Sequence, residues 1–261
     1  ISLTSILSKT MEHILTRYIK AHLEDNSLLC SSQHGFRRNH SCESQLLSTM
    51  EDLLTSYDEG TQSDIIALDM AKAFDTVSHN KLLHKLKHLG MHPTVTTWIR
   101  EWLAGRTSRV VANGVHSKEM MAVSGVPQGS VLGPTLFLIY INDLPDCIRH
   151  SKVRLYADDA LLYTSIKDAS DAEALQEDLS SVCSWAEQWQ LTFNISKCEQ
   201  ITTTRRRSSR DIKYYMDGVQ VPVVSDFKYL GVVISNDLTF ETHIKHCKEG
   251  KLQTGPAKKV P

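Results

Sequence analysis

The sequence predicts an α+β fold, in which helices and hairpins follow one another without the regular alternation of a βαβ series. Several segments place apolar residues at helical spacing, and short β-prone runs lie between turn residues. Hydrophobic residues make up 41% and charged residues 23% of the 261 positions, which is typical of a soluble globular chain with a core. The apolar stretch Val131 to Ile141 is interrupted by Gly133-Pro134 and is too short to span a bilayer, so no membrane association is expected.

Helices are predicted in five segments. They cover residues 5–24, 42–58, 80–89, 93–103 and 171–189. Gly60 and Gly105 follow two of them as stop signals. Asp171 and Glu173 lie in the first turn of the last helix, where the helix dipole favours acidic side chains. Ser130 is expected to cap a further apolar helix that follows it.

Strands are predicted from short β-prone runs. Residues 64–69 form a continuous apolar run that ends in a carboxylate, as expected of a buried strand. Residues 107–123 predict a hairpin with its turn at Asn113-Gly114, and residues 153–163 predict a second one. Further strands are expected near residues 191–194, 212–216, 219–224 and 228–234.

Two adjacent carboxylates lie at the tip of the second hairpin, in the tetrapeptide Tyr156-Ala157-Asp158-Asp159. Packing explains them poorly, because burial of even one unpaired charge is costly. Together with Asp69, which ends an earlier strand, they would offer oxygen ligands to two Mg²⁺ ions for phosphoryl transfer. Each signal is weak alone, because a lone Asp at a strand end is more often a helix cap or a turn residue.

Charge and cysteine content narrow the functional classes. A net charge of −1 argues mildly against a nucleic-acid binder, although arginines form local basic spots. The six cysteines lack any Cys-x-x-Cys spacing, so a zinc site is not expected. They are interpreted as reduced thiols of an intracellular protein, and Cys183 is interpreted as a core residue on the apolar face of its helix.

Three motifs occur together and in order. Asp69 with Ala73-Phe74-Asp75 comes first, residues 125–130 (Gly-Val-Pro-Gln-Gly-Ser) come second, and the tetrapeptide at 156–159 comes third. They closely resemble the A, B and C motifs of reverse transcriptases.

Four further segments extend the resemblance to about residues 1–247. Residues 1–5 and 33–37 are similar to the fingers motifs of non-LTR retrotransposon enzymes of the Jockey and LINE type. Residues 193–197 resemble motif D, and residues 227–231 resemble motif E, the primer grip.

The resemblance implies a right-hand polymerase fold, with helical fingers, a palm built on an antiparallel sheet and a truncated thumb. The implied division is 1–60 partial fingers, 61–80 palm, 81–123 an insertion with a hairpin, 124–210 palm, 211–240 primer-grip region and 241–261 thumb start with a disordered tail. The implied activity is RNA-directed DNA synthesis, which joins dNTPs to a DNA primer 3′-hydroxyl on an RNA template. Two Mg²⁺ ions, with Mn²⁺ as an alternative, and a nuclear location follow from the same resemblance, although no targeting signal is visible.

The resemblance also assigns metal ligands. Asp69 and Asp158 are expected to be the main ligands, together with the backbone carbonyl of Met70, and Asp159 is expected to be auxiliary. Lys197 is expected to act as a general acid toward pyrophosphate, although an exposed lysine near a strand end is more often simply solvated.

The remaining site residues would contact nucleotide, template or primer. Phe74 aligns with a steric gate that excludes a 2′-hydroxyl, and its alternative role is that of a core residue. Gln128 and Gly129 are expected near the nucleotide and template, and Arg37 near triphosphate or template, because arginine suits phosphate. The primer-grip assignment covers Tyr229, Leu230 and Gly231.

Two alternatives stay open at this point. One is an inactive retroelement relic that binds nucleic acid weakly, which the truncated ends would favour. The other is a group II intron-type reverse transcriptase, which residues 1–5 fit less well. The usual Arg-Pro before that segment and an endonuclease domain are both missing, and residues 249–261 depart from the family pattern, so a fragment is expected.

Overall fold

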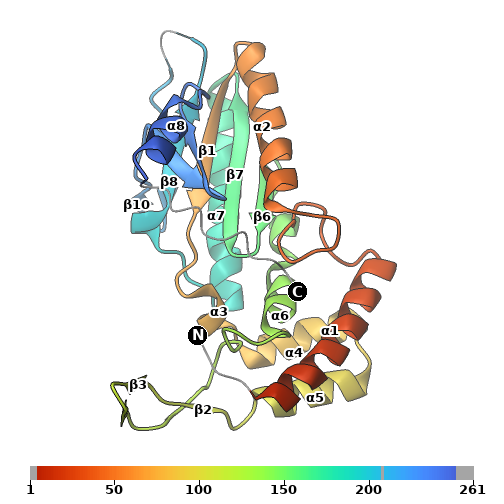
Figure 1. Ribbon diagram of the computed structural model, residues 1–261. Helices are drawn as coiled ribbons and strands as arrows, with labels where there is room; N and C mark the ends of the chain where they lie inside the picture. The colour runs from red at the N-terminus through yellow and green to blue at the C-terminus, as the bar shows by residue number, and fades with distance from the viewer. Residues whose placement is uncertain (1–4, 207–208, 251–261) are drawn as a thin grey trace.

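A central antiparallel sheet organises the protein, whose computed structural model describes residues 5–206 and 209–250. Within that part of the chain its strand order is β6-β7-β1-β8 (Figure 1). The two inner strands are β1 (Gln62–Leu68) and β7 (Asp159–Ile166), and the edges are β6 (Lys152–Tyr156) and β8 (Glu199–Thr203). The predicted buried strand and the predicted second hairpin are therefore confirmed.

Both faces of the sheet are buried. Helix α7 (Ala169–Trp189) covers the face to which Ile66 and Leu162 belong. Helix α2 (Cys42–Asp58) covers the other face, which includes Ile65 and Leu161. Because side chains alternate along a strand, burial on two sides explains why β1 is apolar at successive positions rather than at every second one.

A group of helices lies at the lower end of the sheet in Figure 1. It contains α1 (Ile6–Asp25), α4 (His79–His88), α5 (Pro93–Leu103) and α6 (Gly133–Ile141). All four contribute buried apolar residues to the cluster that also covers the α7 face of the sheet. One continuous core therefore joins these helices to the central sheet.

The helix predicted at 5–24 exists, but it buries only some of the apolar residues whose spacing predicts it. Ile6 and Ile14 share that spacing, yet they are 83% and 60% exposed. The buried positions are instead Glu12, Ile19 and Leu23. Apolar spacing predicts that a segment is helical, but it cannot show which face meets the core when a buried carboxylate has a partner there.

The hairpin predicted at 107–123 is confirmed, with short exposed strands. They are β2 (Thr107–Ser108), β3 (Val111–Ala112), β4 (Val115–His116) and β5 (Met120–Met121). It turns at Asn113-Gly114, both with positive φ, and extends away from the helices at the lower left of Figure 1.

The C-terminal part adds two hairpins and a helix. The first hairpin is formed by β9 (Tyr215–Met216) and β10 (Val219–Gln220), which are shorter than predicted. The second is formed by β11 (Asp226–Tyr229) and β12 (Val232–Ser235) and confirms the strands expected at 228–234, and α8 (Glu241–Lys248) follows. The predicted tail beyond residue 250 lies outside the described residues.

Three predicted details are corrected. Residues 191–194 form an isolated bridge to Met70 through Phe193 rather than a strand. Helix α6 begins at Gly133 with Leu132 as its N-cap, so Ser130 is not the cap, although its hydroxyl accepts a hydrogen bond from the Gly133 amide at 3.0 Å. Cys183 packs against the core but is only half-buried.

Three short helical turns complete the described chain: α3 (Ala73–Thr76), η1 (Leu144–Cys147) and η2 (Ile195–Lys197). All six cysteines lie in described segments and are free thiols. Across residues 5–206 and 209–250, no helix combines the length and apolar character needed to cross a lipid bilayer.

Candidate active site

Strand pairing brings the predicted carboxylates to one end of the sheet. The last β1–β7 pair is Leu68 with Ala160, so the next residues along the two strands are Asp69 and Asp159. Asp158 belongs to the turn that joins β6 to β7. Residues opposite each other on antiparallel strands have Cα atoms about 4.5 to 5.5 Å apart, so the register alone predicts that these carboxylates are neighbours.

Electrostatics supports the same placement. Burial, together with repulsion from the carboxylates of Asp158 and Asp69, raises the pKa of Asp159 to about 6. Carboxylates that repel one another in a partly buried position suit a hard divalent cation, because the cation supplies the missing opposite charge. The donor set therefore fits a hard divalent cation.

The described residues hold no group of three His, Cys, Asp or Glu side chains already arranged as a metal centre. The assignment of Asp69, Asp158 and Asp159 as metal ligands accordingly stays a prediction.

A segment that the sequence places far from Asp69 fixes its backbone. The amide of Asn194 donates a hydrogen bond to the Asp69 carbonyl at 2.8 Å, and the Asp69 amide donates to the Cys198 sulfur at 3.4 Å. The adjoining Ala71 amide donates to the Thr192 carbonyl at 2.8 Å. Lys197 lies in η2 on this segment, with an exposed side chain.

Cys198 is a contact that sequence reasoning missed, because the cysteines were interpreted as scattered thiols. It is fully buried directly before β8, the strand that pairs with β1. Its place directly before a strand that pairs with β1 is the feature that could have indicated a contact with Asp69.

Phe74 lies on α3, and part of its surface belongs to the core. Its ring stacks on Phe137 with centroids 4.4 Å apart, and its side chain is half-buried. The stack fixes the ring five residues beyond Asp69. Both readings of Phe74, as a gate and as a core residue, are compatible with this position.

The loop of residues 124–130 is attached directly to α3. The Gln128 side-chain amide donates to both carboxylate oxygens of Asp75, at 3.1 and 3.2 Å, and the Val126 amide donates to the Phe74 carbonyl at 2.8 Å. Gly125 has φ +80°, and a Cβ there would lie 2.6 Å from the Asp75 carbonyl oxygen. Motifs A and B therefore form one packed unit that leaves Gln128 and Gly129 exposed.

Arg37 follows α1, and its expected contact with triphosphate or template stays a prediction, because its guanidinium has partners within the protein. It makes a two-point ion pair with Glu24, with N–O distances of 3.1 and 3.3 Å, and donates to the Cys30 carbonyl at 2.8 Å. Contact with a triphosphate would require Arg37 to leave Glu24. In this structure it holds its own loop.

The predicted primer-grip residues form the tip of the β11–β12 hairpin. Leu230 and Gly231 have φ +47° and +89°, as a tight turn between strands requires. Tyr229 is buried, and its hydroxyl accepts a hydrogen bond from the Gln45 side chain of α2 at 3.3 Å. Burial raises the pKa of Tyr229 above its usual value.

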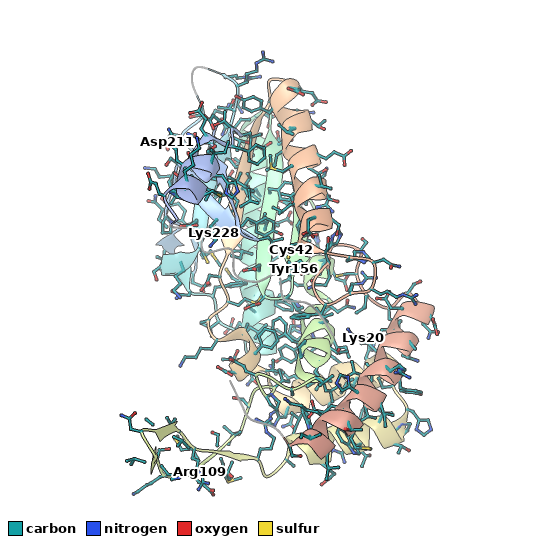
Figure 2. All side chains as sticks on the ribbon, in the orientation of Figure 1. Lys20, Cys42, Arg109, Tyr156, Asp211 and Lys228 are labelled. Atoms are coloured by element: carbon teal, nitrogen blue, oxygen red, sulfur yellow. The ribbon has the colours of Figure 1, made fainter. Side chains whose placement is uncertain are left out.

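At the other side of the carboxylate turn, Tyr156 meets the first residue of α2. It lies beside Cys42 near the middle of the molecule, as Figure 2 shows. Burial and the interaction with Cys42 raise the pKa of Tyr156 to about 12. The turn is thus flanked by the start of α2.

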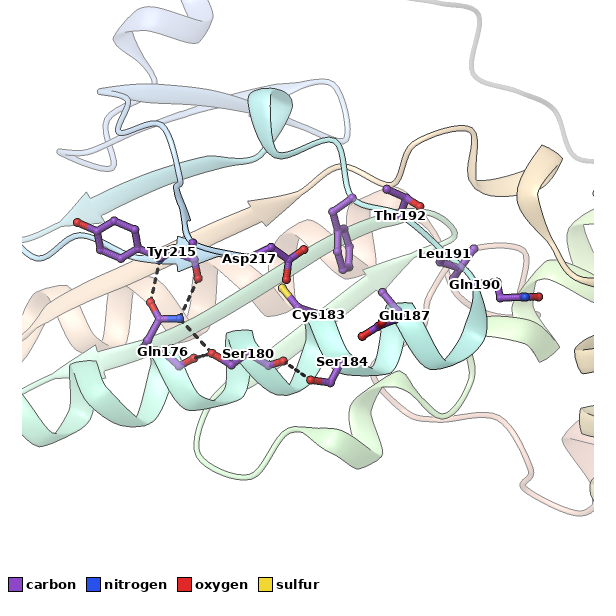
Figure 3. Close-up of a pocket in the computed structure, with 13 residues that line it drawn as sticks. Gln176, Ser180, Cys183, Ser184, Glu187, Gln190, Leu191, Thr192, Tyr215 and Asp217 are labelled. Carbon is purple, nitrogen blue, oxygen red and sulfur yellow. Dashed lines mark hydrogen bonds between the residues drawn. The ribbon is translucent and has the colours of Figure 1, made fainter.

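A polar cleft of about 880 Å³ lies between α7 and the β9–β10 hairpin (Figure 3). Thr192 and Phe193 line its edge, but Asp69, Asp158 and Asp159 are not among its lining residues. The cleft therefore shares part of the segment that fixes Asp69, but it is separate from the candidate site, which lies at the strand ends.

Comparison with known proteins agrees with this arrangement. The reverse transcriptase (RNA-dependent DNA polymerase) family matches residues 1–234. A probable RNA-directed DNA polymerase from transposon X-element of Drosophila melanogaster is 33% identical over 94% of this chain and 27% of its own length. The RNA-directed DNA polymerase from mobile element jockey of Drosophila funebris is 34% identical over 93% of this chain and 27% of its own length. The chain therefore spans about a quarter of the length of these relatives.

Solved structures show the same fold. Telomerase from Candida tropicalis, in complex with a fragment of telomeric RNA, aligns with a TM-score of 0.60 and 15% identity over 91% of this chain and 38% of its own. An apo form truncated from its C-terminal domain aligns with a TM-score of 0.57 and 14% identity over 90% of this chain and 45% of its own. The right-hand polymerase fold is thereby confirmed. Because the family match covers most of the sequence and its relatives are transposon enzymes, the chain belongs to the reverse transcriptase family, in its non-LTR retrotransposon class.

Proposed function

We propose that this chain carries the palm and fingers of an RNA-directed DNA polymerase, which adds dNTPs to a primer 3′-hydroxyl. The observation that supports this most strongly is the β1–β7 register, which makes Asp69 and Asp159 neighbours at one end of the sheet. The pKa of Asp159, raised by burial and by the charges of Asp158 and Asp69, agrees with it. A group II intron-type enzyme is not favoured, because the relatives are transposon polymerases.

In the proposed site the carboxylates bind divalent cations. Asp69 and Asp158 would hold two Mg²⁺ or Mn²⁺ ions together with the Met70 carbonyl, and Asp159 would assist. Bound there, the ions would lower the pKa of the primer hydroxyl and neutralise the triphosphate. The hydrogen bonds from Asn194 and to Cys198 support this role, because they fix the backbone of Asp69 on both sides of its Cα atom.

The other proposed contacts surround these strand ends. Gln128 and Gly129 would meet the nucleotide and template, and Lys197 would protonate the leaving pyrophosphate. The turn at Leu230-Gly231 would contact the primer. In support, Gln128 is hydrogen-bonded to Asp75 on α3, and Leu230 packs against the apolar cluster that contains Ile65 of β1 and Leu161 of β7. Lys197 lies two positions before β8, which pairs with β1.

Primer extension tests the proposal. A DNA primer annealed to an RNA template is incubated with the protein, dNTPs and Mg²⁺, and product length is followed on a gel. We expect templated extension that stops when EDTA is added. A folded protein that binds primer–template but adds no nucleotide in Mg²⁺ or Mn²⁺ would instead support the inactive relic.

Sugar selectivity gives a separate prediction for Phe74. Replacement Phe74→Val removes the ring that the gate hypothesis places under the sugar, so we expect rNTP use relative to dNTP to rise by about tenfold or more, which corresponds to about 1.4 kcal/mol. Competition between dNTP and rNTP in single-nucleotide addition measures the ratio.

The matched control is Phe137→Leu, which disturbs the same ring stack from the buried side. It should lower stability without changing the ratio. If selectivity is unchanged in an active Phe74→Val protein, Phe74 is a core residue only.

A further inference from the structure

We propose that Gln33, a fingers residue, is a positioning residue for the Ala157-Asp158 turn, so that its buried amide holds the carboxylates where a metal ion can bind. The inference deepens the proposed function and rests on it. Gln33 lies 124 positions before Ala157 and is 1% exposed.

The side-chain amide of Gln33 contacts the turn directly. Its Oε1 accepts hydrogen bonds from the Ala157 amide at 2.9 Å and from the Gly35 amide at 2.7 Å. Its Nε2 donates a longer bond to the Ala157 carbonyl at 3.5 Å. Both backbone groups of the residue preceding Asp158 therefore have the same buried side chain as a partner.

The backbone around Gln33 is also fixed against the sheet. The Leu155 amide donates to the Ser32 carbonyl, and the His34 amide donates to the Leu155 carbonyl, both at 2.9 Å. These bonds form a parallel bridge between Gln33 and Leu155 on β6. The amide of Gln33 thus approaches the turn from a segment that is itself held at the sheet edge.

The turn needs such support because Ala157 adopts a left-handed conformation. Its φ is +56°, which costs a residue with a Cβ about 1 kcal/mol or more relative to ordinary backbone. Ala157 is 5% exposed, so its amide has little access to water as an alternative partner. Loss of the Gln33 acceptor would leave a buried donor unpaired and allow the turn to relax.

Close approach of the two segments depends on Gly35. A Cβ at position 35 would lie 2.4 Å from the Ala157 nitrogen, which is shorter than any non-bonded contact. Glycine is the residue that lets two backbones approach so closely. Arg37 secures the same loop through Glu24 and the Cys30 carbonyl. The loop that contains Gly35 and Arg37 therefore packs directly against the carboxylate turn.

A purely structural role for Gln33 is the alternative, since a buried glutamine stabilises any fold it joins. The two roles differ in what a substitution changes. Substitution of a residue that orients a metal ligand through a hydrogen bond typically lowers metal affinity or activity by 10- to 100-fold. A structural residue would alter stability alone.

The experiment compares Gln33→Met with Gln62→Met. Methionine matches glutamine in length but offers no comparable acceptor. Gln62 is a buried glutamine that binds Asp64 and Arg210 at the opposite end of β1 from Asp69, so it is the matched control. Mn²⁺ affinity is measured by electron paramagnetic resonance without nucleic acid, and melting temperature and single-turnover addition rate are measured in parallel.

We expect Gln33→Met to weaken Mn²⁺ binding about tenfold and to slow addition about 10- to 100-fold, with the dNTP KM changed less. Gln62→Met should lower the melting temperature and leave metal affinity within about twofold. Should Gln33→Met fail to fold, Gln33→Asn, whose amide is withdrawn by one methylene, is expected to show the same loss of metal affinity.

Three results would decide against the inference or against its basis. Lowered stability with unchanged Mn²⁺ affinity and rate in a Gln33 variant would overturn the positioning role. A wild-type protein that binds Mn²⁺ but extends no primer would contradict the proposed function, and the affinity comparison would still test Gln33. A wild-type protein that binds no Mn²⁺ would overturn both.

Discussion

Replacement Asp158→Asn is expected to reduce nucleotide addition by about 10³-fold or more while the protein stays folded. Loss of a carboxylate ligand removes several kcal/mol of transition-state stabilisation, and each 1.36 kcal/mol corresponds to a factor of ten in rate. The substitution keeps the shape of the side chain and removes one of the charges that raise the pKa of Asp159. The melting temperature without metal should therefore stay the same or rise. Single-turnover addition and thermal unfolding measure the two effects.

The control is Asp217→Asn, at the turn between β9 and β10. It makes the same chemical change away from the strand ends, and we expect the rate to stay within about twofold of wild type. An Asp158→Asn protein that adds nucleotides at near wild-type rate would contradict the assignment of Asp158 as a metal ligand.

The largest expected loss of stability comes from Glu12→Ala. Glu12 lies on α1, is fully buried, and accepts hydrogen bonds through Oε2 from the amides of Val131 at 2.7 Å and Leu132 at 3.2 Å. These amides precede the first residue of α6, whose N-cap has no side-chain partner of its own. A carboxylate there also interacts favourably with the positive end of the α6 dipole.

Alanine at position 12 leaves the buried Leu132 amide and the part-buried Val131 amide without this acceptor. Each costs about 1–3 kcal/mol, so we expect unfolding free energy to fall by about 2–4 kcal/mol in urea titration. Glu12→Gln is the matched control, because it keeps an acceptor oxygen and loses only the charge, and it should cost about 1 kcal/mol. A loss below about 0.5 kcal/mol for Glu12→Ala would show that α1 does not anchor α6.

Most of the elements could be predicted from the sequence, because their signals are local. The helices at 42–58 and 93–103 follow from apolar spacing and stop signals, and their predicted bounds match those in the structure. The buried face of α1 could not be predicted, since the partners of the buried Glu12 are the amides of Val131 and Leu132, which lie about 120 positions further along the chain. The prediction of a strand at 191–194 was also wrong, because this segment pairs with its neighbour only through the single bridge between Phe193 and Met70.

The candidate site divides in the same way. Motif order in the sequence located Asp69 and Asp158, and the register agrees with their convergence. The supports of the site were not predictable, because Gln33 and Cys198 act through hydrogen bonds to segments more than 100 positions away. An arginine side chain is well suited to bind phosphate, but in the structure the guanidinium of Arg37 forms an ion pair with Glu24 on α1.

The most direct test of a metal-dependent polymerase site is anomalous diffraction from crystals of the protein with primer–template, dNTP and Mn²⁺. We expect manganese density within about 2.0–2.4 Å of carboxylate oxygens of both Asp69 and Asp158, at the end of the sheet where β1 and β7 part. Manganese bound at another surface, with Asp69 and Asp158 turned away from each other in a complex that holds substrate, would contradict the assignment.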